Sequence, residues 1–249
     1  MHNPVFRYPG GKARLAPWIA DHLPPPGSYR VFIDVFGGSG SVLLEIMRRC
    51  ACDKKKTLLV YNDVDGEVVN FFCVLRDVKK RAELRELLRW TPYSRQQYAA
   101  CIAGEAPSPG CAEDIARAWR FFVLQQQTFG AATARPSPGQ WACDLAGDAL
   151  SRWLNSQERL EAFGEVFRRV VIENLDFTDI LRRYCAPGVL VYCDPPYFPS
   201  TRRPGMYQHE MPAERHGELA RLLRDFPGMA AVSGYRCEEY DTWKTTRGT

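Results

Sequence analysis

The sequence predicts an α/β protein with a parallel, doubly wound sheet that is interrupted by a mostly helical segment. Short apolar runs typical of buried strands alternate with amphipathic helical stretches near both ends of the chain. Strands that are separated by helices favour parallel crossover connections. The runs expected to form strands are residues 31–36, 57–62, 170–174, 189–193 and 229–233.

Helices are expected on both sides of these strands and throughout the middle of the chain. In the α/β part they are predicted at residues 13–23, from about 41, at 65–76 and at 214–224. In the middle they are predicted at residues 79–89, 94–103, 113–129 and 157–169, with a loop rich in Gly, Pro and Ala at 130–147. We therefore expect a discontinuous α/β domain, residues 1–76 and 166–249, that carries a helical insert, residues 77–165.

Length, composition and charge are those of an ordinary globular protein. The chain has 249 residues, of which 45% are hydrophobic and 25% charged. Its net charge of +4 is compatible with a polyanionic partner. No apolar run approaches the roughly 18–20 residues that cross a bilayer, so we expect a cytoplasmic protein. The nine cysteines form no Cys-x-x-Cys pair, so we expect free thiols and no metal site.

A glycine turn follows the first predicted strand. Asp34 closes that strand, and Gly37, Gly38 and Gly40 come next, before a helix. Glycines let the backbone approach a ligand, and a helix N-terminus offers unpaired N–H groups. Asp63, after the second strand, is placed to accept hydrogen bonds from ribose hydroxyls. The pattern predicts an adenosine-containing cofactor, and its spacing disfavours a nicotinamide one.

The tetrapeptide Asp194-Pro195-Pro196-Tyr197 directly follows the strand predicted at 189–193. An exocyclic amino nitrogen of a base is a poor nucleophile, because its lone pair is delocalised into the ring. The Asp194 carboxylate and the Pro195 carbonyl offer two acceptors for its hydrogens, and the prolines fix that carbonyl. Tyr197 is suited to stacking on a base removed from the duplex. These residues predict methylation of a base amino group.

Taken together, these motifs resemble the Dam-like, D12-class adenine-specific DNA methyltransferases. The N-terminal segment Arg7-Tyr8-Pro9-Gly10-Gly11-Lys12 is similar to a family motif, although it lacks the spacing of a phosphate-binding P-loop. The resemblance implies a Rossmann-like methyltransferase fold, S-adenosylmethionine as cofactor, double-stranded DNA as partner and transfer to N6 of a flipped adenine. The catalytic residues it implies are Asp194, Pro195, Pro196 and Tyr197.

The resemblance also implies which residues bind the cofactor. The glycine turn would cradle its methionine part, Asp63 would hold its ribose, and Asp176-Phe177 would flank its adenine. The full set expected to bind the cofactor is Tyr8, Gly10, Gly11, Lys12, Asp34, Phe36, Gly37, Gly38, Gly40, Asp63, Asp176, Phe177 and Asp194.

Three features depart from the family pattern. Val35 stands where proline is usual, and Gln126-Gln127 stand where Asn-Arg is expected, so the resemblance does not transfer the GATC target. The sequence also stops soon after Ser233-Gly234-Tyr235. Residues 236–249 are too few and too polar for the closing hairpin of the family, so the ending is either naturally short or cropped.

DNA contacts are expected from the helical insert and from the segment after the tetrapeptide. Arginine suits phosphate contacts, and glutamine pairs with adenine in the major groove. The candidates are Arg95, Gln126, Gln127, Arg135, Arg202 and Arg203.

Two alternatives stay open at this point. The same tetrapeptide suits cytosine N4 in DNA or an amino group of an RNA base, because these are also planar amines. The short C-terminus motivates a protein of another class, a non-catalytic DNA-binding module that retains the fold.

Overall fold

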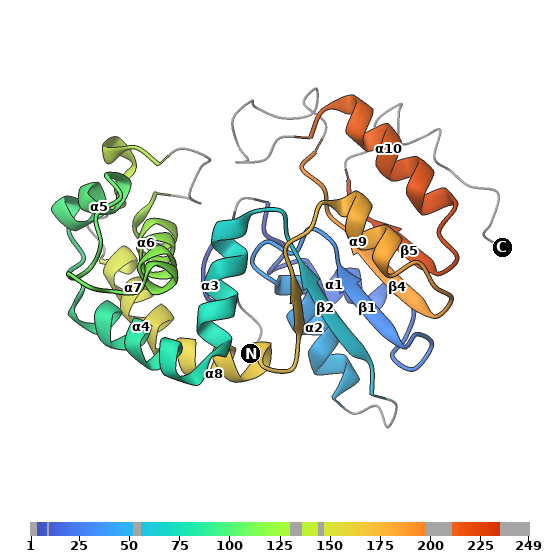
Figure 1. The fold of residues 1–249 in the computed structure, drawn as a ribbon, viewed down its shortest axis with the longest axis horizontal. Helices are drawn as coiled ribbons and strands as arrows, with labels where there is room; N and C mark the ends of the chain where they lie inside the picture. Colours follow the sequence, from blue (N-terminus) through green and yellow to red (C-terminus); the bar gives the residue numbers. More distant parts are fainter. Residues whose placement is uncertain are drawn as a thin grey trace.

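The computed structural model describes residues 4–8, 10–51, 56–129, 136–143, 147–197 and 211–234. Within these ranges, five strands form one all-parallel sheet in the order β3-β2-β1-β4-β5 (Figure 1). They are β1 (Val31–Asp34), β2 (Leu58–Asn62), β3 (Val171–Glu173), β4 (Val189–Cys193) and β5 (Met229–Val232). The prediction of a parallel α/β sheet is confirmed, and no strand end differs from the predicted one by more than two residues.

Alternate residues of the strands bury opposite faces of the sheet. On one face, Phe32 and Tyr61 pack in a core with helices α1 (Ala16–Asp21), α2 (Ser41–Cys50) and α3 (Gly66–Arg76). On the other, Ile33 and Val191 pack with α9 (Phe177–Arg183) and α10 (Ala213–Arg224). Helices on both faces make the sheet doubly wound, as predicted. The seven-residue α9 was not predicted, because so short a helix carries little periodicity.

Five helices form a lobe beside the sheet (Figure 1, green to yellow). This helical lobe contains α4 (Val78–Trp90), α5 (Arg95–Ile102), α6 (Glu113–Gln127), α7 (Asp148–Glu158) and α8 (Leu160–Phe167), with a short 3₁₀ turn at Pro138–Gln140. The prediction of a single helix at 157–169 is wrong, because two helices, α7 and α8, meet at Arg159. The residue before α7, Gly147, has a left-handed backbone conformation. Whether residues 77–165 form a separate insert stays a prediction.

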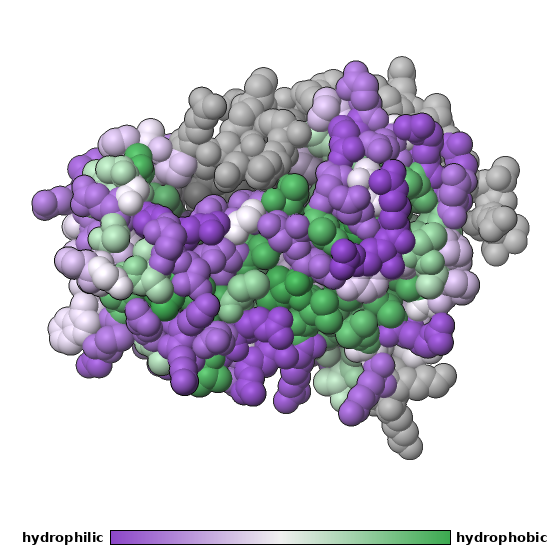
Figure 2. All heavy atoms as spheres, in the orientation of Figure 1, coloured by the Kyte–Doolittle hydropathy of each residue, from purple (hydrophilic) through white to green (hydrophobic). Residues whose placement is uncertain are grey.

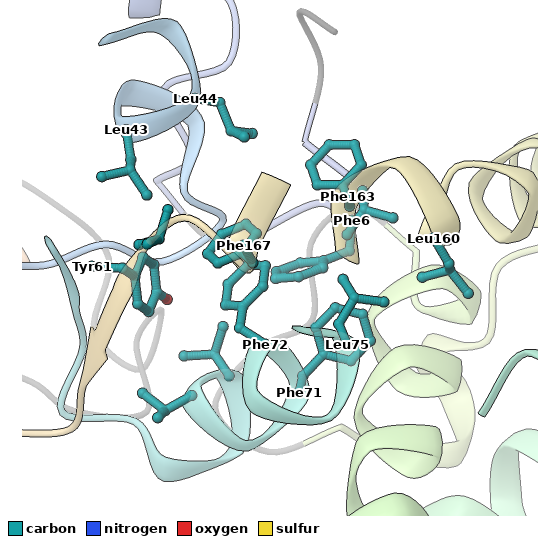
Figure 3. Packing of buried hydrophobic residues seen from close by; sticks show 14 of the residues in the cluster. Phe6, Leu43, Leu44, Tyr61, Phe71, Phe72, Leu75, Leu160, Phe163 and Phe167 are labelled. Carbon is teal, nitrogen blue, oxygen red and sulfur yellow. The ribbon is translucent and has the colours of Figure 1, made fainter. Parts of the chain in front are cut away.

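Aromatic side chains join the helical lobe to the sheet (Figure 3). Phe72 of α3 stacks on Phe167 of α8 with ring centroids 4.0 Å apart, and it also packs edge-on against the ring of Tyr61 at 5.0 Å. Phe6 packs edge-on against Phe71 at 5.4 Å. Aromatic pairs in these geometries add to the free energy gained by burying their area. The N-terminal segment is thereby fixed against α3, beside the carboxyl end of β2.

The surface separates into hydrophilic and hydrophobic regions. Figure 2 shows hydrophilic residues over much of the helical lobe and over α10, with hydrophobic residues gathered over the strands between them. Within the described ranges, no helix is long and apolar enough to cross a membrane. The same residues contain no cluster of three or more His, Cys, Asp or Glu side chains arranged to hold a metal ion.

Candidate active site

A cavity of about 300 Å³ lies where the chain reverses its winding across the sheet. Strand β1 lies between β2 and β4, and the helices that follow β1 and β4 cover opposite faces. In doubly wound sheets, ligands bind in this crevice, outside the carboxyl ends of the strands. Asp34 is the last residue of β1, Asp194 follows β4 directly, and both line the cavity.

The glycine turn forms one wall of the cavity, and side chains larger than hydrogen do not fit there. A Cβ atom on Gly37 would lie 2.3 Å from Cε2 of Tyr61, whose hydroxyl donates to the Gly38 carbonyl at 2.7 Å. Gly38 and Gly40 have φ of +49° and +70°, in the left-handed region that favours glycine. Gly40 also precedes the first residue of α2. The turn therefore brings bare backbone to the cavity at the start of a helix.

Two polar residues at the end of β2 hold the surrounding loops. The Asp63 carboxylate accepts the Gly38 N–H at 2.7 Å and the Asp65 N–H at 2.9 Å. The Asn62 amide donates to the carbonyls of Val35 and Leu175 at 2.9 and 3.0 Å. Asp63 lines the cavity as expected and also fixes the glycine turn. The sequence analysis missed that buried Asn62 links the loops after β1 and β3, because the sequence does not show which loops lie beside this residue.

The N-terminal segment reaches across to the tetrapeptide. The Lys12 ammonium donates to the Gly10 carbonyl at 2.8 Å and to Oδ2 of Asp194 at 2.5 Å. It also lies 4.9 Å from the centroid of the Tyr197 ring, within cation–π range. The Lys12 and Asp194 side chains are only 10% and 15% exposed. Oδ1 of Asp194 is buried and has no hydrogen-bond partner among the described residues.

Burial shifts the acid–base behaviour of this cluster. Burial raises the pKa of Asp194 above its ordinary value, and the ion pair with Lys12 opposes that rise. Burial disfavours the charged form of Lys12, but Asp194 and Tyr197 outweigh it and raise the pKa of the amine. Burial, with the negative charges of Asp194 and Asp63, raises the pKa of Asp34 to about 8. Asp34 is thus largely protonated at neutral pH, and it lies close to the Lys12–Asp194 salt bridge.

A second polar cluster lies at the start of α9. Asp176 caps this helix by accepting the Thr178 N–H, and it accepts a 2.5 Å hydrogen bond from Arg215 of α10. The Arg215 guanidinium carbon lies 4.2 Å from the centroid of the Phe177 ring. Phe177 in turn packs against Phe36, with ring centroids 5.9 Å apart. Except for Thr178, all of these residues line the cavity.

The structure brings nearly all of the residues expected to bind the cofactor to this one cavity. Of that set, only Gly40 does not line it. Of the four catalytic candidates, Asp194 and Pro196 line the cavity, Pro195 is buried beside it, and Tyr197 lies under Lys12. Lining residues that the sequence analysis missed are Ser39, Ser41, Val42, Val64, Tyr192, Met211, Pro212 and Arg215.

The candidates for DNA contact have different surroundings. The exposed Arg95 lies over the Trp141 ring, 4.9 Å from its centroid. Gln126 donates to the Val5 carbonyl at 2.7 Å. Gln127 is fully buried, and both ends of its amide are bonded within the helical lobe. Arg135, Arg202 and Arg203 lie outside the described residues.

Comparison with known proteins identifies the family. The sequence profile of the D12 class N6 adenine-specific DNA methyltransferases matches residues 8–239. The chain belongs to this family. It is similar to the DNA N-6-adenine-methyltransferase of Escherichia phage P1, with 25% identity over 89% of this chain and 28% of the phage protein. It is also similar to the DNA adenine methylase of Vibrio cholerae, with 24% identity over 78% of this chain and 65% of that protein.

The matched part of this chain spans less than two thirds of the length of either relative. Members of the D12 class use S-adenosylmethionine and act on DNA. The cavity fits such a cofactor in two respects. One wall is glycine backbone without side chains, and one buried oxygen of Asp194 accepts no hydrogen bond from the described residues.

Proposed function

We propose that this protein is a site-specific DNA adenine N6-methyltransferase that uses S-adenosylmethionine. The observation that carries the proposal is the position of Asp194. Asp194 directly follows β4 at the reversal point of the sheet, and its carboxylate borders the cavity and accepts from Lys12. Among the described residues, its second, buried oxygen has no hydrogen-bond partner. A buried acceptor without a partner is costly, and its retention beside a cavity favours a ligand that donates to it.

The chemistry assigned to each residue follows from this placement. S-adenosylmethionine, when bound, supplies the electrophilic methyl group. Asp194 accepts one N6 hydrogen and the Pro195 carbonyl accepts the other, which returns electron density to the nitrogen. Tyr197 stacks on the extruded adenine. The N6 lone pair would attack the methyl carbon as the carbon–sulfur bond breaks and S-adenosylhomocysteine leaves. The proton lost from N6 would pass to Asp194 or to water. Lys12 keeps Asp194 ionised until that moment.

Target recognition is proposed for the helical insert of residues 77–165. Its exposed Arg95 is suited to a phosphate contact. Gln126 would have to release the Val5 carbonyl before it contacts a base. Gln127 is buried, and its amide nitrogen and oxygen both form hydrogen bonds inside the helical lobe, so stabilising the lobe suits it better than contacting a base. Such an enzyme would act in the cytoplasm of a bacterium or of a phage-infected host.

Mass spectrometry of modified nucleosides tests the reaction. The protein is incubated with S-adenosylmethionine and unmethylated genomic DNA, or with total RNA in parallel. The proposal predicts N6-methyldeoxyadenosine in the DNA digest alone. N4-methyldeoxycytidine, or methylation of RNA only, would overturn the assignment of substrate. If the protein binds DNA but does not bind S-adenosylmethionine, the assignment as an enzyme is overturned.

A further inference from the structure

Arg215 bridges α9 and α10 where they border the cavity. Its Nη2 donates to Oδ2 of Asp176 at 2.5 Å, and its Nη1 pairs with Glu218 one turn along α10. Its guanidinium carbon lies 4.2 Å from the centroid of the Phe177 ring. One side chain of α10 therefore contacts both residues that begin α9 and line the cavity.

These contacts fix the orientation of the Asp176 carboxylate. Oδ1 accepts both the N–H and the hydroxyl of Thr178, at 3.0 and 2.7 Å, and Oδ2 accepts from Arg215. An ionised carboxylate has about four lone-pair sites, so the contacts with described residues leave one of them open on Oδ2. Burial would raise the pKa of Asp176, but the hydrogen bonds from Arg215 and Thr178 outweigh it and hold the pKa below its ordinary value. The retained site is therefore an acceptor at neutral pH.

The stacking contact fixes the neighbouring ring. A guanidinium over an aromatic face is held by cation–π attraction, and its flat, forked shape also permits bidentate pairing. Arg215 thus orders an acceptor and an aromatic wall together. That combination suits an aminopurine, whose ring packs against Phe177 while its amino group donates to Asp176.

We propose that Arg215 is a positioning residue that makes the cofactor pocket select a 6-aminopurine over a 6-oxopurine. This inference rests on the proposed function, since it places the cofactor adenine beside Asp176 and Phe177. The 6-oxo group has no hydrogen to donate, and its partly negative oxygen would be repelled by the fixed carboxylate of Asp176. Specificity arises because a carboxylate that cannot rotate away leaves this repulsion uncompensated.

The test is calorimetric titration with S-adenosylhomocysteine and S-inosylhomocysteine, in which oxygen replaces the 6-amino group. The variants are Arg215→Ala and Arg215→Lys, with Arg221→Ala as a control on the exposed side of the same helix. Circular dichroism melts establish that each variant is folded. For wild type we expect S-adenosylhomocysteine to bind at least about tenfold more tightly than the inosine analogue, the effect of one good hydrogen bond to a charged group.

Arg215→Ala is expected to weaken S-adenosylhomocysteine about tenfold and the inosine analogue less than about threefold, so the preference narrows. Arg215→Lys keeps a charge without the planar fork, so its preference should fall between these values. Arg221→Ala should bind as wild type does. Equal weakening of both ligands by Arg215→Ala, or an unchanged preference, would overturn the inference while leaving the proposed function intact. Failure of the wild type to bind S-adenosylhomocysteine would overturn both.

Discussion

The ammonium nitrogen of Lys12 lies 2.5 Å from Oδ2 of Asp194, although 182 residues separate them in the chain. Both side chains are mostly buried. The contact joins the N-terminal turn to the loop after β4, and it sets the charge of the group on which the proposed reaction depends. A buried carboxylate without a cation would tend to protonate, and the neutral carboxyl group is a weaker hydrogen-bond acceptor.

Replacing Lys12 by Met removes the ammonium and keeps an unbranched apolar side chain. Burial then raises the pKa of Asp194 without opposition from Lys12, so the acid limb of the kcat–pH profile should move to higher pH. At pH 7 and saturating cofactor, kcat should fall by about 100-fold or more, the lower end of what one preorganised electrostatic contact contributes. Lys79→Met, at an exposed position of α4, is the control. An acid limb that stays at the wild-type pH in Lys12→Met would contradict the role given to this lysine.

Asp34 should make folding stability depend on pH. Its pKa is raised to about 8 in the folded protein, against about 3.9 in an unfolded chain. Between these values the folded state binds more protons, so the free energy of unfolding falls as pH rises, by at most about 1.4 kcal/mol per pH unit. Below the lower value the stabilisation is complete, and above pH 8 it is lost.

The Asp34→Asn variant should lack this contribution. Urea unfolding of both proteins at intervals from about pH 5.5 to 8.5 measures it, with Asn remaining neutral throughout. The wild type should lose stability more steeply than the variant across this range. Parallel curves would mean that Asp34 ionises in the folded protein as an ordinary carboxyl does.

Two glycines should respond to alanine in opposite ways. At Gly37 the new methyl group would meet the buried Tyr61 ring at 2.3 Å, whereas at Gly217 of α10 nothing lies within 4 Å. Gly37→Ala should lower the free energy of unfolding by about 1–3 kcal/mol, as overpacking does, and should weaken cofactor binding. Gly217→Ala should raise it by up to about 1 kcal/mol, because alanine favours helix. Denaturant titration compares them, and a stable Gly37→Ala protein with normal binding would rule out the close backbone approach.

The sequence was most informative where buried strands end in short motifs. The run of residues 189–193 is buried throughout, and the strand observed there has the predicted ends. That strand places Asp194 at the carboxyl edge of the sheet, and the same reasoning places Asp34 and Asp63. Parallel pairing then brings these acids to one cavity, because carboxyl ends of parallel strands share an edge.

Contacts between distant elements were beyond reach of the sequence. Arg215 belongs to a helix with unremarkable polar periodicity, and only the packing of α10 against α9 brings it to Asp176. The break at Arg159 was missed because the residues on either side continue an apolar helical pattern. The burial of Gln127 was missed because its hydrogen-bond partners, Pro92 and Trp141, lie far from it in sequence and meet it only in the folded helical lobe.

In the proposed function, methyl transfer to DNA depends on the Asp194 carboxylate. The most direct test of this dependence measures tritiated methyl transfer from S-adenosylmethionine to unmethylated genomic DNA by wild type and Asp194→Ala, after melts show that both are folded. We expect transfer by the wild type and a loss of at least about 100-fold in the variant, the scale for removing one transition-state contact. Comparable transfer by both proteins, or none by a wild type that binds the cofactor, would contradict it.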